Sequence, residues 1–337
     1  MDSLPAVQFG VWYDFRQARP RTLDYSRFYA ECLREIELAE DLGYSHVWLS
    51  EHHLVEDGYL PAPLVVAAAI ASRTSHLQIG TNILLLPLYH PLRLAEDVAV
   101  LDLVSAGRFT LGVGGGYVEF EFENFGVQRR QRPSLMEEGI AILRQAWDEG
   151  KVDHQGERWK VGPRPFSPQP ERRIPIFFGA NSEAAVRRGA RLGDGYLATA
   201  PNGFANAKQH REWWQAAGGK GPFVVSAWVY VHQDDDQAWR EAAPAIAYQQ
   251  SCYADWGTDR DQPRPHRLHS NSLKRRDYPL IGNPMTVARG LMKAYREVPF
   301  DQVCFWGRLP GMNHSQACQS MTMFMEEAVP IFLEGLR

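Results

Sequence analysis

The sequence predicts an α/β protein that folds as a single (β/α)8 TIM barrel with loop insertions. About eight short apolar segments of strand character alternate with helical patterns, and a parallel sheet of that many units closes into a barrel more readily than it stays open. The 337 residues are 45% hydrophobic, which is enough for one large core. Since no extended Pro/Gly/Ser linker divides the chain, we expect residues 1–337 to form one domain.

The first strand and helix show how each element is recognised. Residues 7–13 are rich in Val, Phe and Trp, and Phe28, Leu33 and Ile36 then recur at helical spacing before Gly43. The same patterns predict strands at 7–13, 47–49, 77–85, 109–113, 174–178, 195–199, 223–231 and 303–306. They predict helices at 25–42, 64–73, 92–104, 135–147, 183–192, 204–217, 238–249, 285–296 and 315–333.

Two stretches do not fit the alternation and are expected to be insertions. Residues 150–173 carry four prolines, and residues 252–282 are polar and aperiodic with several basic side chains. A long loop without periodic structure is usually an active-site lid or a disordered segment. We expect 252–282 to be a lid, with a plain solvated insertion as the alternative.

The composition argues against several classes of function. A net charge of -4 and a pI near 6.3 lack the basic surface that a nucleic-acid-binding protein requires. The four cysteines are far apart and form no CxxC pair, so they indicate neither a disulfide framework nor a zinc cluster. The first residues lack the basic and apolar regions of a secretory signal. The expected location is the reducing cytoplasm.

Glu51, His52 and His53 follow the strand at 47–49 directly. Groups at the carboxyl ends of barrel strands project into the active-site mouth. Adjacent residues at a strand end point in opposite directions, so the two histidines are not expected to bind one metal ion. One imidazole should face the cavity, where it can act as a general acid or base. The alternative is a pair of hydrogen-bonded structural histidines.

A second candidate is the turn Gly179-Ala180-Asn181-Ser182, which leads from a strand into a helix. Free backbone amides at a helix start, with the helix dipole, form an anion site that fits a phosphate. The alternative, that Asn181 or Ser182 only caps the helix, is compatible with this role.

Gly114, Gly115 and Gly116 end the fourth strand and allow a flat or phosphorylated ligand to approach the backbone closely. The run is not a dinucleotide fingerprint, because its third glycine is misplaced and the chain is expected to continue as a loop through 119–122. A simple strand-to-loop turn is an equally good interpretation.

Taken together, these motifs give the chain a resemblance to the bacterial luciferase-like flavin monooxygenases over nearly all of its length. The motifs are VWLSEHH at 47–53, IGTNILLLPLYHPLRLAEDVAVLDLVSAGRFTLGVGGGY at 79–117, IPIFFGANSEAAVRRGARLGDGY at 174–196 and KRRDYPLIGNP at 274–284. The resemblance implies a barrel that takes reduced FMN from a separate reductase and, with O2, oxidises a small organic substrate through a flavin hydroperoxide.

The resemblance also assigns roles to residues near the cofactor. It gives His52, next to Glu51, a part in catalysis and places a non-prolyl cis peptide at Asn82-Ile83. Ser182 and the amides of Ala180 and Asn181 match the family's phosphate turn. An arginine of the family stands at the position of Gly115, so the clamp on the phosphate is expected to lack one charge.

Further expectations concern the lid, the cavity and assembly. The segment ending in Lys274, Arg275 and Arg276 resembles a mobile lid that keeps water from the oxygenated flavin. The candidate walls of the substrate cavity are four side chains near strand ends, Trp12, Tyr89, His90 and Tyr117. A homodimer packed through the apolar helix at 64–71 is a family expectation.

Three other functions stay open at this point. Relatives with the same fold use a deazaflavin coenzyme for hydride transfer without oxygen, and glycine-rich loops after the fourth strand occur there too. Some members of the family bind flavin without turnover, although intact Glu51 and His52 argue against this interpretation. A metal-dependent hydrolase is disfavoured because the sequence lacks suitably spaced ligands, so no metal is expected.

Overall fold

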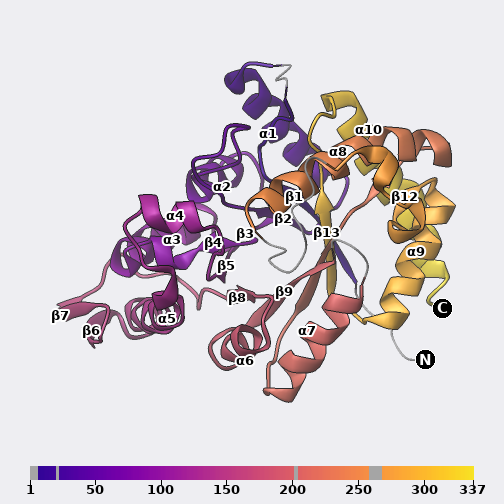
Figure 1. Cartoon of the computed structure of the whole chain (residues 1–337). Helices are drawn as coiled ribbons and strands as arrows, with labels where there is room; N and C mark the ends of the chain where they lie inside the picture. The colour runs from indigo at the N-terminus through magenta and orange to yellow at the C-terminus, as the bar shows by residue number, and fades with distance from the viewer. Residues whose placement is uncertain (1–6, 20–22, 201–203, 258–267) are drawn as a thin grey trace.

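The computed structural model describes residues 7–19, 23–200, 204–257 and 268–337. Eight parallel strands close into a barrel, in which β3 pairs with both β2 and β5 (Figure 1). The barrel strands are β1 (Gln8–Tyr13), β2 (His46–Leu49), β3 (Gln78–Thr81), β5 (Phe109–Gly114), β8 (Ile176–Gly179), β9 (Gly195–Ala200), β10 (Phe223–Ala227) and β13 (Gln302–Trp306). The predicted barrel is confirmed.

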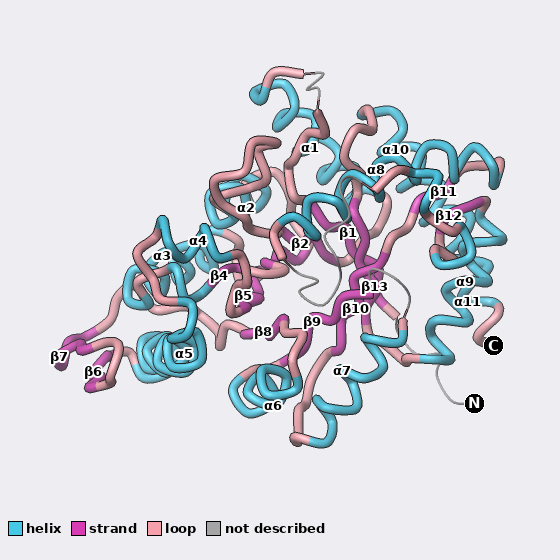
Figure 2. Tube along the Cα trace, in the orientation of Figure 1, coloured by secondary structure: helices cyan, strands magenta, loops and turns pink. Residues whose placement is uncertain are grey.

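Helices surround the strands on the outside (Figure 2). They are α1 (Tyr25–Asp41), α2 (Pro63–Ala71), α3 (Pro91–Val104), α4 (Glu119–Asn124), α5 (Arg132–Glu149), α6 (Glu183–Leu192), α7 (Ala205–Ala216), α8 (Asp235–Asp255), α9 (Pro284–Glu297), α10 (His314–Met323) and α11 (Val329–Glu334). Among the described residues, no helix is long and apolar enough to cross a membrane.

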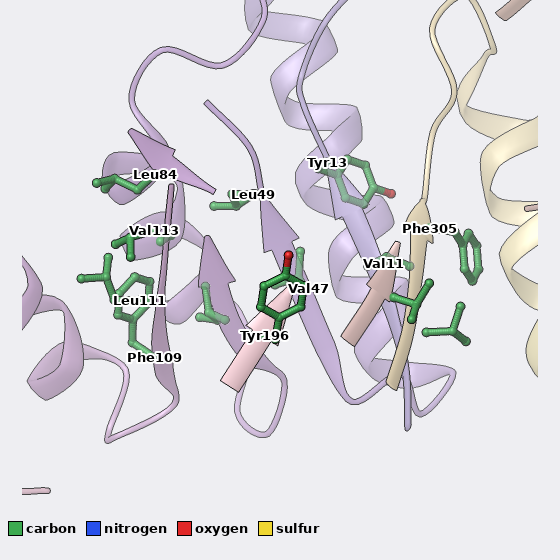
Figure 3. Close-up of a cluster of buried hydrophobic side chains, with 14 of the residues drawn as sticks. Val11, Tyr13, Val47, Leu49, Leu84, Phe109, Leu111, Val113, Tyr196 and Phe305 are labelled. Atoms are coloured by element: carbon green, nitrogen blue, oxygen red, sulfur yellow. The ribbon is translucent and has the colours of Figure 1, made fainter. Parts of the chain in front are cut away.

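The alternation of side chains along each strand produces two cores. Val11, Val47 and Phe305 lie on the outer face of the sheet and pack with the helices, and Figure 3 shows part of this outer core. Trp12 and Trp48, from the alternate positions, belong to a second cluster inside the barrel. The interior is therefore filled by side chains, as expected for a barrel of this size.

Trp48 fills the floor of the barrel. A Cβ atom on Gly80 would lie 2.4 Å from Cζ3 of Trp48, so only glycine leaves room for the indole on the neighbouring strand. The indole N–H donates to Oε1 of Gln302 at 2.8 Å, and the ring lies 6.0 Å from Phe177, centroid to centroid. These side chains fill the barrel toward the amino ends of the strands.

The insertions hold more structure than the sequence predicts. Residues 150–173 contain the hairpin of β6 (Lys151–Gln155) and β7 (Lys160–Pro165). The first residues of the expected lid belong to α8, which continues to Asp255, and residues 258–267 lie outside the described part. The expected loop at 119–122 is wrong, since α4 begins at Glu119.

Two expected strands and one expected helix are interrupted. The strand at 77–85 divides into β3 and β4 (Leu84–Leu85). The strand at 223–231 divides into β10 and β11 (Tyr230–Val231), and β11 pairs with β12 (Ile281–Gly282) in a separate small sheet. The last helix contains a π-helical turn between α10 and α11. Apolar periodicity continues through these breaks, so the sequence gives little sign of them.

Candidate active site at the barrel mouth

His52 lies just beyond β2, at the carboxyl end of the barrel, and is almost completely buried. Its Nδ1 is 2.9 Å from Oε1 of Glu121, a fully buried carboxyl group on α4. Its Nε2 is 3.3 Å from the hydroxyl of Tyr117. The imidazole is therefore held at both nitrogen atoms, by a carboxyl group on one side and a phenol on the other.

Aromatic rings enclose the imidazole of His52. The ring centroids of Trp256, Tyr59, Tyr117 and Tyr253 lie 4.6, 4.8, 5.5 and 6.2 Å from that of His52. Burial raises the pKa of Tyr117 well above its usual value, so its hydroxyl keeps the proton and can donate to Nε2. This enclosure limits the access of water to the imidazole.

Glu51 pairs with the other histidine. Its Oε1 is 2.9 Å from Nε2 of His53 and accepts from the Tyr89 hydroxyl at 2.6 Å, while its Oε2 accepts from the backbone N–H of Leu85 at 2.6 Å. The structure thus separates Glu51 from the His52 imidazole, although the two residues are neighbours in the sequence. Glu51 fixes the end of β4 and the position of the Tyr89 ring.

The Asn82-Ile83 peptide bond is cis, at the place that the resemblance implies. The Asn82 amide crosses the barrel and donates to the Ser226 hydroxyl at 2.9 Å. Ile83 lies over the ends of two strands, because a Cβ atom on Gly114 or Gly179 would lie 2.3 Å or 2.6 Å from its side chain. These two glycines therefore make room for Ile83, which forms a ledge at the mouth.

The turn from β8 into α6 has the features of an anion site. Ser182 is the N-cap residue of α6, and among the described residues its side chain makes no capping hydrogen bond. Asn181 and Ser182 are exposed, so the first amides of α6 are accessible to a ligand. The carbonyl of Ala180 accepts a hydrogen bond from Tyr196, which anchors the turn.

An arginine from another element lies beside Gly115. A Cβ atom on Gly115 would lie 3.9 Å from Cδ of Arg132, at the start of α5, and the Arg132 guanidinium donates to the carbonyl of Gly116. Partial burial lowers the pKa of the Arg132 guanidinium below its usual value. The side chain of Arg132 therefore lies next to Gly115, and its guanidinium is bound to the backbone of the same loop.

The four residues expected to form the wall of the substrate cavity do not all lie together in the structure. Tyr117 contacts His52, and Tyr89 is held by Glu51. Trp12 stacks on Trp306 with centroids 4.2 Å apart, and Trp306 stacks on Trp228 at the same separation. These three buried indoles lie side by side at the carboxyl ends of the adjacent strands β1, β13 and β10.

His90 and the basic residues of the expected lid lie away from this cluster. His90 is exposed and packs against Trp159, near the β6–β7 hairpin. Arg275 forms an ion pair with Asp236 at 2.7 Å, at the start of α8, and Arg276 is mostly exposed. Lys274 precedes the short 3-10 helix that carries both.

Several residues of the site escape sequence reasoning. The sequence predicts a loop at Glu121, and no motif marks Arg132, Trp228 or Trp306. Within the described residues, no group of three His, Cys, Asp or Glu side chains could hold a metal ion.

Known proteins share this architecture. The model of the luciferase-like monooxygenase family matches residues 7–302. The oxygenase component of flavin-dependent trigonelline monooxygenase from Acinetobacter baylyi is 24% identical, over 92% of this chain and 91% of the relative. F420-dependent glucose-6-phosphate dehydrogenase from Amycolatopsis mediterranei is 31% identical, over 49% of this chain, which spans about half (52%) of that relative.

A solved structure extends the likeness to the whole fold. The oxygenating constituent of 3,6-diketocamphane monooxygenase from Pseudomonas putida, in complex with FMN, has a TM-score of 0.78 and 18% identity. The match covers 97% of this chain and 98% of that one. With the family model matched along most of the chain, this protein belongs to the luciferase-like monooxygenase family.

Proposed function

We propose that this protein is the oxygenase component of a two-component monooxygenase. It would take reduced FMN from a separate reductase and use O2 to oxidise a small organic substrate. The observation that carries the proposal is His52, a buried imidazole held at both nitrogens inside an aromatic enclosure, on the same barrel rim as the exposed turn that begins α6. The flavin-dependent monooxygenases among the similar proteins support the same activity.

The residues of the mouth suit an FMN molecule. Its phosphate would lie at the amides of Ala180, Asn181 and Ser182, with the α6 dipole and the guanidinium of Arg132 to balance its charge. The uncommitted Ser182 hydroxyl and the open space at Gly115 leave room for it. The flavin ring would rest on the side chain of Ile83, above Gly114 and Gly179. Gly116 has a positive φ of 67°, which favours glycine in the turn after β5.

When bound, reduced FMN supplies the electrons that activate O2. The protein supplies proton control and shelter. His52 would donate or accept a proton at Nε2, where Tyr117 is its hydrogen-bond partner. The rings of Tyr59, Tyr253 and Trp256 would keep water from the reacting atoms.

The substrate would meet the wall of Trp12, Trp306 and Trp228. The N–H groups of Trp12 and Trp228 are buried and have no acceptor among the described residues. A buried N–H without an acceptor costs free energy, so an acceptor oxygen of a bound molecule would stabilise this wall. Planar substrates with such oxygens suit the stacked indoles.

A deazaflavin-dependent oxidoreductase is the second candidate. The relative that uses F420 and the glycine-rich loop at Gly114–Gly116 favour it. The monooxygenase consumes oxygen and the deazaflavin-dependent oxidoreductase does not, so oxygen uptake distinguishes the two candidates.

The test combines calorimetry with activity assays. We expect reduced FMN to bind, and we expect oxygen uptake in the presence of a flavin reductase. In the variant His52→Asn, turnover should fall about 10²-fold or more while folding and FMN affinity persist, as is typical for loss of an acid-base group. Absence of FMN binding in both redox states contradicts the proposal. Reduction of deazaflavin without oxygen use selects the second candidate, and tight FMN binding without any oxygen use indicates a flavin-binding protein without turnover.

The location and assembly are also proposals. All four cysteines are free, which agrees with a reducing cytoplasm. Val65 on α2 is 72% exposed, and Val100, Leu103 and Val104 on α3 are 48%, 36% and 54% exposed. Helices α2 and α3 contact each other, so these side chains form a candidate apolar surface that a second copy of the chain would cover in a homodimer.

A further inference from the structure

Glu121 is the one glutamate of α4 that faces inward. Glu119 and Glu123, two positions before and after it, are exposed, and Glu119 forms an ion pair with Arg129. Glu121 itself has no exposed surface. Burying a carboxyl group is costly unless hydrogen bonds compensate, so its position calls for a specific partner.

Both partners of Glu121 come from the segment after β2. Its Oε1 lies 2.9 Å from Nδ1 of His52 and accepts from the backbone N–H of His53 at 2.8 Å. Its Oε2 is buried and has no hydrogen-bond partner in the part of the chain that the structure describes. One oxygen atom thus holds both the imidazole and the backbone next to it.

The acceptor at Nδ1 determines where the proton of the imidazole resides. A carboxyl oxygen that already accepts from a backbone N–H is an acceptor for Nδ1–H, so Nδ1 is the protonated nitrogen of a neutral ring. Nε2 is then free to accept from the Tyr117 hydroxyl, whose raised pKa keeps it a donor. The ring presents one defined atom to the barrel mouth.

We propose that Glu121 is the positioning residue of the site: it holds His52 as the Nδ1–H tautomer, so that Nε2 faces the reacting groups. The role of Nε2 in turnover rests on the proposed function, whereas the tautomer does not. Glu51 cannot serve in the same way, because its two oxygens are used by His53, Tyr89 and Leu85.

Two substitutions separate the effect of the acceptor oxygen of Glu121 from the effect of its side-chain volume. Glu121→Gln keeps an acceptor oxygen for His52 and His53, so it should keep most of the turnover. Its N–H₂ group would replace Oε2, which has no partner among the described residues, so the cost of this variant should fall on stability. Glu121→Leu removes the acceptor. We expect it to lower kcat for oxygen uptake about 10- to 100-fold with little change in the KM for reduced FMN. This loss is within the range that acid-base groups contribute.

A double-mutant cycle distinguishes positioning from a purely structural effect. In the His52→Asn background, Glu121→Leu should cause no further loss of kcat, because the group that it orients is gone. A structural effect would lower kcat equally in both backgrounds. Equal losses, or an unchanged kcat in Glu121→Leu, overturn the proposal.

A spectroscopic measurement tests the tautomer without any cofactor. In protein labelled with ¹⁵N-histidine, the signal that disappears in His52→Asn identifies the ring, and its nitrogen shifts should report Nδ1–H at pH 8. Because the wild-type spectrum suffices, the test stands even if Glu121→Leu does not fold. A wild-type ring protonated at Nε2 refutes the positioning role. Failure to bind FMN alongside the Nδ1–H signal refutes only the proposed function.

Discussion

His46, at the floor of the barrel, makes the protein sensitive to acid. The indole N–H of Trp48 donates to Oε1 of Gln302, so the Gln302 amide must turn its N–H₂ toward Nδ1 of His46. Nδ1 therefore accepts a hydrogen bond from Gln302, and it also lies 2.9 Å from Oγ of Ser45. Burial lowers the pKa of His46 from 6.5 to about 4.

The magnitude follows from the difference between the two pKa values. Between 6.5 in the unfolded chain and about 4 in the folded protein, at about 1.4 kcal/mol for each pH unit, the group accounts for roughly 3 kcal/mol. Since the folded pKa is the lower one, this stability is complete above pH 6.5. It is lost as the pH falls toward 4, where the unfolded chain binds a proton that the folded protein rejects.

Asp14 changes stability in the opposite direction over the same range. Burial raises its pKa from 3.8 to about 6, so the free energy that it contributes is lost as the pH rises from about 4 to about 6. The wild-type curve alone therefore mixes two opposite slopes. Comparison with His46→Gln removes this problem, because Asp14 is present in both proteins.

The assay is urea unfolding at a series of pH values between 7.5 and 4.5, followed by tryptophan fluorescence. Going from pH 7.5 to 4.5, the wild type should lose about 2 to 3 kcal/mol more than His46→Gln does. NMR titration of the His46 ring provides the folded pKa directly. Parallel stability curves for the two proteins, or a ring that titrates near 6.5, would refute the reasoning.

Two further predictions concern the proposed FMN site and assembly. Arg132→Leu should weaken FMN binding about 10-fold or more but leave riboflavin binding unchanged, since riboflavin lacks the phosphate. The matched control is Arg130→Leu, which removes an exposed arginine nearby in the sequence. Equal losses of affinity for both ligands in Arg132→Leu would count against the role of Arg132. In sedimentation experiments the wild type should be a dimer and Val65→Asp with Val104→Asp a monomer; a monomeric wild type would contradict the homodimer.

The fold was largely readable from the sequence because each strand–helix unit carries its own local pattern. The helix at 183–192 agrees with α6 residue for residue, and all eight barrel strands lie where apolar runs predict them. The errors occur where tertiary contacts override local pattern. The strand at 77–85 breaks at Asn82, whose side chain is drawn to Ser226 on β10, a partner 144 positions away.

The region of the candidate site could be predicted from the sequence, but the pairing of its side chains could not. The end of β2 and the start of α6 were identifiable because strand ends and helix starts concentrate chemistry in this architecture. Which carboxyl group meets which imidazole depends instead on the path of the loops. Glu51 is adjacent to His52 in sequence and points to His53, whereas Glu121, 69 positions away, reaches Nδ1 of His52.

The direction of side chains after a strand explains why Glu51 contacts His53 and not His52. Successive residues that leave a strand alternate in direction, so a carboxyl group next to a histidine turns away from its ring and toward the residue two positions on. Glu51 and His53 are related in this way. His52 is left to find its partner from another element, and a six-residue helix brings Glu121 there. A search for the orienting carboxyl group of a strand-end histidine should therefore begin on the neighbouring loops rather than beside it in the sequence.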